Sequence, residues 1–354
     1  MVQWLAETAH RTLEGLLTSI TPNSCSSSCP FKIPTRQRCP STACSCSMGR
    51  VHQAIEEAGK QGALLLDGFD RSEVEAAATY LADEDGGIGY LFSGWCQAAL
   101  PHRRLPDHKG WQVSGERVTL IVEPGMRPGP SGEPIHVGVP FGSRARLILL
   151  YLQSEALKTG NREVELGAHL TQWMRRLGVP IGGRSADQVR EQAERLAMCK
   201  LSFHVRAGSA SGMLQQTIVD SAFFVDTDDD AEPDQGPLFA EKARLSEGFF
   251  QQLQKHPVPL EEAAIRALQN NSMALDLYAW AAYRLHSLKA PTPVSWRALK
   301  PQFGVAFGRM DNFRARFLDN LKLALAVYPE ARVDITDTGL LLHPSRPPVA
   351  PRIK

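Results

Sequence analysis

The chain has 354 residues, of which 43% are hydrophobic and 22% are charged, and its formal net charge is +1. These values are typical of a folded globular protein with two or three domains, and they exclude a collagenous or a highly charged disordered chain. The apolar stretch nearest the N-terminus is interrupted by Glu7, His10, Arg11 and Glu14. No stretch is both apolar and long enough for a membrane span, and none has the pattern of a signal peptide. We therefore expect a cytoplasmic protein with reduced thiols.

Residues 1–47 form a Ser-, Pro- and Thr-rich tract that contains five of the seven cysteines. Only one residue separates Cys44 from Cys46, which is closer than the two-residue spacing of most zinc knuckles, and no histidine follows at ligand distance. The spacing therefore argues against a zinc site. The composition predicts a disordered tract, or one upstream of a true start at Met48.

Residues 48–140 predict an N-terminal region of helices and one β-hairpin. Apolar residues at three-four spacing over 51–82 indicate helices. Two apolar runs, 111–113 and 118–122, flank a Ser-Gly-Glu turn as in a hairpin. The Pro- and Gly-rich residues 125–132 are expected to be a linker.

Residues 141–226 show a pattern of helices and strands that residues 260–343 repeat. In the first copy we expect helices at 141–160, 167–178 and 185–200 and strands at 163–166, 201–206 and 213–225; in the second, helices at 260–288, 295–302 and 310–327 and strands at 332–337 and 339–343. Three helices followed by a two-stranded wing form the winged helix-turn-helix, whose third helix lies in the major groove of DNA. The sequence therefore predicts a mainly α protein with small β-wings (α+β), in which two tandem winged-helix domains follow a small N-terminal region.

The segments around the second copy differ in charge. The acidic run 226–234 lacks the spacing of an EF-hand, so we expect residues 227–259 to be a solvated linker. From Arg284 to Lys354 the chain carries 12 Lys or Arg against 5 Asp or Glu, and residues 344–354 form a Pro-rich basic tail. Positive charge on the predicted wing and third helix suits the phosphates of DNA, although a solvated basic surface is the alternative.

Base recognition supplies the candidate site residues. Arginine pairs well with guanine, and Asn or Gln with adenine, from the first two turns of a recognition helix. The predicted DNA-contacting residues are Arg184, Ser185, Gln188 and Arg190 in the first copy and Arg309, Asn312 and Arg316 in the second. Each could instead be an ordinary polar residue on an exposed helix face. We also expect Ser185 to cap its helix, and Gln192 and Arg195 to lie on the outer face of that helix.

No catalytic motif is evident. Gly59-Lys60 lacks the rest of a phosphate-binding loop. The ten histidines include no pair spaced as His-x-His or His-x-x-x-His, so a metal-dependent nickase is not supported. Cys199 is expected to be a buried structural thiol. The sequence thus predicts no catalytic residue, no cofactor and no metal, and a protein that is not an enzyme.

Four segments resemble a known family. Val139–Gln153 and Glu165–Gly178, together with Gly89–Trp95 and Asp311–Phe317, are similar to the plasmid-encoded RepA replication proteins of broad-host-range bacterial plasmids. The resemblance covers roughly residues 86–343. It implies a theta-type initiator that binds repeats in the double-stranded DNA of a plasmid origin, bends and opens them, and helps to recruit host replication proteins such as the helicase.

Two other classes of function remain as alternatives. A two-winged-helix transcriptional regulator or partition protein would bind DNA without supporting replication. A relaxase or nuclease is disfavoured by the lack of a catalytic motif. No membrane partner is expected, and the sequence leaves open whether the chain forms a homodimer.

Overall fold

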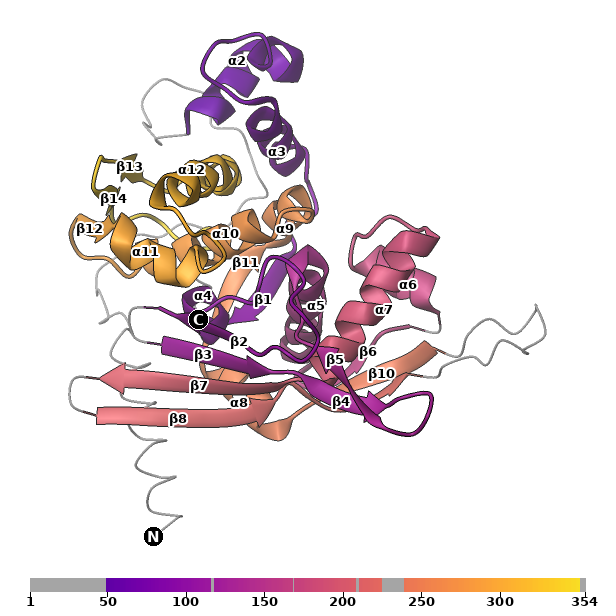
Figure 1. Cartoon of the computed structure of the whole chain (residues 1–354). Coiled ribbons are helices and arrows are strands. Elements are labelled where there is room, and N and C mark those ends of the chain that lie inside the picture. Colours follow the sequence, from indigo (N-terminus) through magenta and orange to yellow (C-terminus); the bar gives the residue numbers. More distant parts are fainter. Residues whose placement is uncertain (1–48, 116–117, 168, 208–209, 225–238, 351–354) are drawn as a thin grey trace, which may run out of the picture.

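A computed structural model describes residues 49–115, 118–167, 169–207, 210–224 and 239–350. The predicted Cys-rich tract of residues 1–47 and the acidic run 226–234 lie outside these ranges. Within them, helices alternate with five small antiparallel sheets, so the fold is mixed α and β (Figure 1). No helix among the described residues is long and apolar enough to cross a membrane.

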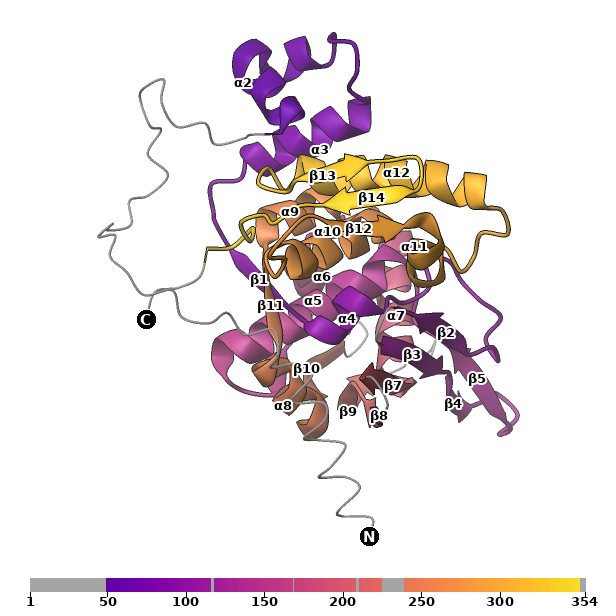
Figure 2. The same cartoon turned by 90° about the vertical axis from the view of Figure 1, so that its left-hand side faces the viewer.

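The N-terminal region packs against the C-terminal half of the chain. Helices α2 (Arg50–Ala63) and α3 (Arg71–Leu81) lie beside α12 (Met310–Ala326), as both overall views show (Figures 1 and 2). The imidazole Nε2 of His52 is 2.8 Å from the carbonyl oxygen of Ala326. Segments far apart in the sequence therefore share one part of the core.

Short strands follow α2 and α3 in the sequence. Strand β1 (Ile88–Phe92) pairs with β11 (Pro257–Glu261), and helix α4 (Ser93–Gln97) follows β1 directly. The predicted hairpin is confirmed as β2 (Trp111–Ser114) and β3 (Val118–Glu123). The expected linker at 125–132 is wrong in part, because a second hairpin, β4 (Gly125–Pro128) and β5 (Pro134–Gly138), begins there.

The first unit, residues 142–245, consists of three helices closed by a three-stranded sheet. Its elements are α5 (Gly142–Thr159), β6 (Glu163–Glu165), α6 (Leu170–Arg176), α7 (Gly183–Met198), β9 (Val219–Phe224) and β10 (Phe239–Leu245). Strand β10 lies between β6 and β9, so the strands of the unit stand in the order first, third, second. Helix α5 ends at Gly160 in the left-handed conformation (φ 68°), which glycine adopts without strain.

The strands that close the first unit differ from those predicted. The expected wing corresponds to β7 (Lys200–Ala207), β8 (Ala210–Thr217) and β9. Strands β7 and β8 do pair, but β7 also pairs with β3, in the four-stranded sheet β2-β3-β7-β8. This hairpin is therefore an insertion between α7 and the sheet of the first unit. The residues of β3 that pair with β7 lie 77 to 87 positions earlier in the sequence, where no local pattern could indicate them.

The prediction that residues 227–259 form a linker is wrong from residue 239 onward. That segment contains β10, helix α8 (Glu247–Lys255) and the start of β11. Ala243 and Leu245 of β10 are buried, and α8 buries Phe249 and Leu253. These apolar residues, at alternating spacing in β10 and at three-four spacing in α8, hold the segment in the core. The neighbouring acidic run led to the prediction of a linker instead.

The second unit, residues 272–342, repeats the order of the first. Its elements are α10 (Ser272–Leu285), β12 (Thr292–Ser295), α11 (Trp296–Phe303), α12, β13 (Val333–Ile335) and β14 (Gly339–Leu342). The sheet order β12-β14-β13 is again first, third, second. The unpredicted strand β12 contains Pro293, which an edge strand tolerates because one side of it needs no hydrogen bond.

Side-chain caps mark the starts of α10 and α11 in this unit. The Oδ1 atom of Asn271 accepts a hydrogen bond from the amide of Ala274, and Ser295 Oγ accepts one from Ala298. The cap at Asn271 explains why the helix expected over 260–288 is divided into α9 (Glu262–Leu268) and α10. The Ser295 cap agrees with the predicted start of α11.

An aromatic cluster fixes α12 against α11. Phe317 of α12 lies with its ring centroid 5.7 Å from Trp296, 5.7 Å from Phe303 and 5.5 Å from Phe313. All four side chains are buried. Offset and edge-to-face ring contacts of this kind favour one packing geometry, so the opposite, polar face of α12 is held in a defined position.

Candidate nucleic-acid interface

The outer face of α7 carries the residues expected to contact DNA in the first unit. Arg184, Gln188 and Arg190 are exposed, and Ser185 is half-buried in the first turn. The helix begins two residues earlier than predicted, with Gly182 at the N-cap and no capping side chain. The prediction that Ser185 caps α7 is therefore wrong, because the chain enters the helix through the two glycines that precede Arg184.

Three carboxylates share this face, and each is paired with an arginine. The pairs, measured between carboxylate oxygen and guanidinium nitrogen, are Asp187 with Arg190 at 3.6 Å, Glu191 with Arg104 at 3.2 Å and Glu194 with Arg127 at 3.3 Å. Arg104 and Arg127 come from the N-terminal region, from the loop before β2 and from β4. That region therefore offsets the negative charge of α7, and a paired carboxylate repels a phosphate less than an unpaired one.

Two residues expected on the outer face are buried instead. Arg195 is 2% exposed, and its Nη2 lies 2.8 Å from Asp107 Oδ1 and 2.9 Å from Glu191 Oε1. Gln192 accepts a hydrogen bond of 2.7 Å from the amide of Phe141. Both side chains lie at the edge of the apolar stripe of α7. The loop before β2 and the end of β5 cover that edge. Helical periodicity alone could not reveal this cover.

The second unit presents its expected residues at the N-cap and on the first two turns of α12. Arg309, Asn312 and Arg316 are all exposed. Arg309 pairs with Asp311 through two contacts, Nε to Oδ1 at 3.0 Å and Nη2 to Oδ2 at 2.6 Å, and this hydrogen bonding lowers the pKa of Asp311. Arg316 lies 3.9 Å from Asp319. Ion pairs so exposed to water are weak, so both arginines can exchange their partners for a phosphate or a base edge.

Two further cations near α12 have structural contacts that the sequence did not indicate. The guanidinium carbon of Arg314 lies 5.1 Å from the centroid of the Trp296 ring. Lys300 Nζ donates to the carbonyl oxygen of Gly308 at 2.9 Å, which closes the turn between α11 and α12. These contacts stabilise the α11–α12 segment and leave the outer face of α12 to Arg309, Asn312 and Arg316.

A buried ion pair joins the first helices of the two units. Arg146 on α5 donates to Asp276 on α10 from Nε at 2.8 Å and from Nη2 at 2.7 Å. The side chains are 7% and 10% exposed. The remaining donors of Arg146 reach three backbone carbonyls, those of Leu100, Pro101 and Gly142. The guanidinium is therefore fully hydrogen-bonded, as a buried charge requires.

Sequence reasoning missed this pair, although a signal was present. Each charge stands alone in an apolar stretch, Arg146 within 145–150 and Asp276 within 273–282. Single opposite charges on the apolar faces of two helices indicate a partner, because an isolated buried charge is very costly.

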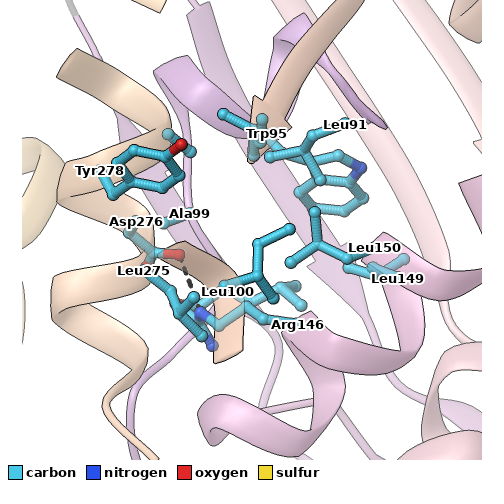
Figure 3. A pocket seen from close by; sticks show the side chains of 13 residues that line it. Leu91, Trp95, Ala99, Leu100, Arg146, Leu149, Leu150, Leu275, Asp276 and Tyr278 are labelled. Carbon is cyan, nitrogen blue, oxygen red and sulfur yellow. Dashed lines mark hydrogen bonds and ion pairs between the residues drawn. The ribbon is translucent and has the colours of Figure 1, made fainter. Parts of the chain in front are cut away.

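A small cavity lies beside the pair (Figure 3). Its volume is about 30 Å³, and its apolar wall includes Leu91, Trp95 and Leu150. Arg146 and Asp276 form its polar edge. The space is large enough for about one or two water molecules.

The cysteines of the described ranges, Cys96 and Cys199, are both buried and free. Burial raises the pKa of the Cys199 thiol to about 12 and also raises that of Cys96. Both are protonated at neutral pH, so the expectation that Cys199 is a structural thiol is confirmed. Within the same ranges, no group of three or more His, Cys, Asp or Glu side chains is arranged to hold a metal ion.

Part of the chain matches a known protein family. Residues 139–296 match the family model described as "Plasmid encoded RepA protein". No curated protein matches the chain. Two crystal structures of domains 2 and 3 of RctB are similar to it at 11% identity. One covers 71% of this chain and 96% of that chain at a TM-score of 0.46, and the other covers 70% and 94% at 0.41. The resemblance found in the sequence is confirmed by the family model, which matches residues 139–296 of the chain.

Proposed function

We propose that this chain is a plasmid replication initiator that binds duplex DNA through two winged-helix units. The observation that carries the proposal is the repeated topology. Apart from the β7–β8 hairpin inserted into the first unit, each unit runs helix, strand, helix, helix, strand, strand, with its sheet in the order first, third, second. This order is the one expected of a winged helix, whose third helix enters the major groove, and it supports the proposal. Helices α7 and α12 are then the recognition helices.

The exposed residues of the two helices suit base reading. Arg184, Gln188 and Arg190 on α7 can donate to guanine or adenine edges, and Ser185 in the first turn can reach a phosphate or a base. On α12, Arg309, Asn312 and Arg316 have the same chemistry. Most of the sequence-independent affinity would come from phosphate contacts by the basic segment from Arg284 to Lys354.

The ion pair between Arg146 and Asp276 supports simultaneous binding by both units. It connects α5 to α10, the first helix of each unit, and α5 lies between α10 and α7 (Figure 1). A fixed junction lets both recognition helices approach one duplex without a large ordering cost. Major grooves on one face recur every 10–10.5 bp, so each chain would cover about two turns.

The role of the protein is binding and deformation of DNA, without catalysis. Bending and local melting at A·T-rich sequence would prepare the origin for host replication proteins such as the helicase. A second copy of the chain is a further candidate partner at repeated sites. We assign no cofactor and no ATP hydrolysis to the protein.

A plasmid that carries only the origin tests the proposal when the gene is supplied in trans. We expect the plasmid to be established, and the purified protein to protect about two turns per repeat and to sensitise adjacent A·T-rich DNA to single-strand-specific probes. If the plasmid is not established while the protein still represses a nearby promoter, the chain is a transcriptional regulator instead.

A further inference from the structure

The loop between α4 and β2, residues 101–110, touches both units, and we call it the junction loop. At one end, His102 Nδ1 lies 3.0 Å from Ser272 Oγ at the start of α10. At the other end, Asp107 pairs with Arg195 of α7, and Arg104 pairs with Glu191 of the same helix. The junction loop therefore extends from the first helix of the second unit to the third helix of the first unit.

The backbone of this loop is held in place. The carbonyl oxygen of Pro101 accepts hydrogen bonds from Arg146 and from the amide of Gly142, both at 3.0 Å. The amide of Lys109 donates to Pro106 at 2.9 Å, and the indole Nε1 of Trp111 donates to Ala99 at 2.9 Å. Side chains on such a loop are presented at fixed positions, which lowers the entropic cost of binding.

Two positive charges of the junction loop are not neutralised by an ion pair within the described residues. Arg103 and Lys109 are exposed, and they form no ion pair or side-chain hydrogen bond with any part of the chain that the structure describes. The loop contains a single acid, Asp107, and Arg104 and Arg195 both pair with it. Among the residues that the structure describes, no ion-pair partner therefore accounts for Arg103 and Lys109.

The position of the junction loop favours contact with DNA over the alternative, an ordinary solvated surface. Arg104 reaches Glu191, which follows Arg184 and Gln188 along one stripe of α7 at three-four spacing. The junction loop thus lies beside the face that the proposed function directs to the DNA. If the two units occupy successive major grooves, the backbone of the duplex between those grooves faces the junction of the units.

We propose that the junction loop binds the sugar-phosphate backbone of duplex DNA between the two major grooves, with Arg103 and Lys109 as the phosphate contacts. This inference rests on the proposed function. Arg104 has a different role, since it offsets the charge of Glu191 and positions the loop against α7. Contacts to phosphate alone carry no sequence preference, so the junction loop contributes affinity and not specificity.

The test replaces the two cations together, Arg103→Ala with Lys109→Ala. We expect affinity to fall roughly tenfold at 0.1 M salt for origin repeats and for an unrelated duplex alike, and the salt slope of log K to decrease by about two. The matched control, Lys60→Ala with Arg71→Ala, removes two exposed cations of α2 and α3 and should leave both quantities unchanged. The charge-conserving variant Arg103→Lys with Lys109→Arg should retain most of the affinity.

The outcomes separate this inference from the proposed function. If the unaltered protein binds no duplex, both are overturned. If it binds origin repeats and the alanine variant, unfolding at the same urea midpoint, has the same affinity and salt slope, only the junction-loop contact is overturned. A loss confined to origin repeats with an unchanged slope would also overturn it, because the residues would then read bases.

Discussion

Arg146 and Asp276 are 130 residues apart in the sequence, yet they form a buried, doubly hydrogen-bonded ion pair between the first helices of two units with the same topology. Desolvation of two charges offsets much of their attraction, so such a pair contributes more to a unique geometry than to net stability. The pair therefore fixes α5 relative to α10, as the proposed binding of two grooves at once would require.

Removal of the acid alone should be strongly destabilising. In Asp276→Ala the guanidinium of Arg146 stays buried without a counter-charge, and we expect a loss of about 3–5 kcal/mol in the free energy of unfolding. Urea unfolding followed by circular dichroism measures this loss. Asp276→Asn should cost less, because the amide oxygen still accepts a hydrogen bond from Arg146.

An apolar replacement of both partners is the control for that experiment. The variant Arg146→Met with Asp276→Leu should lie within about 1–2 kcal/mol of the unaltered protein, since no unpaired charge remains. If it is as unstable as Asp276→Ala, lost packing and not lost pairing explains the single variant. We also expect the apolar variant to bind two-groove sites less tightly than the unaltered protein, relative to single-groove sites.

His102 should make stability depend on pH. Burial and the neighbouring Arg146 lower the pKa of His102 to about 4, whereas an unfolded histidine titrates near 6.5. Protonation therefore favours the unfolded chain. The stability is fully present above pH 6.5 and is lost as the pH falls toward 4, by roughly 3 kcal/mol for this group.

The variant His102→Gln isolates this contribution. Its free energy of unfolding, compared with that of the unaltered protein at a series of pH values, should fall less steeply between pH 6.5 and 4. Burial also lowers the pKa of His52, so His52→Gln is measured in parallel as a second buried histidine. Identical pH profiles for His102→Gln and the unaltered protein would contradict the assignment.

Local patterns predicted the helices well, because the relevant information is local. Periodicity places α12 within one residue of its observed end, and Ser295 marks the start of α11. The sheet partners could not be read in this way. Strand β10 reaches β6 from beyond the acidic run, and β7 pairs with β3 across most of the first unit. Such pairings depend on tertiary packing, which leaves no period in the sequence.

In the candidate site too, local patterns predicted some features, whereas those that depend on tertiary packing were missed. Helical spacing correctly identified the exposed residues of α7 and α12, such as Gln188 and Asn312. It placed Arg195 on the surface, because it could not show that the junction loop covers that edge of α7. It also missed Arg104 and Arg127, whose importance comes from the carboxylates that they meet in the folded chain.

The buried thiols should resist alkylation in the folded protein. Burial raises the pKa of Cys199 to about 12, and only the thiolate reacts rapidly. After treatment with iodoacetamide at pH 8, peptides that contain Cys96 or Cys199 should be unmodified, and they should be fully modified in denaturant. Mass spectrometry of the digested protein measures both. Rapid modification of Cys199 without denaturant would show that the end of α7 opens.

The second unit gives the most direct prediction for DNA binding. Replacement of its two exposed arginines, Arg309→Ala with Arg316→Ala, should weaken binding to origin repeats by several-fold to a few hundred-fold, because each lost base contact costs about 1–3 kcal/mol. Neither arginine side chain is buried, and the exposed carboxylates of Asp311 and Asp319 are their ion-pair partners among the described residues. The thermal midpoint of the variant should therefore be unchanged.

A variant at the other end of the same helix is the matched control for this experiment. Lys322 of α12 pairs with Asp70 beside α3, far from the first two turns, and Lys322→Ala should leave affinity for the repeats nearly unchanged. Competition with mutated repeats distinguishes base contacts from phosphate contacts. Loss of discrimination at one or two positions of the repeat identifies Arg309 and Arg316 as base readers. A folded double variant that binds every repeat as tightly as the unaltered protein would remove α12 from the interface and leave α7 as the recognition helix.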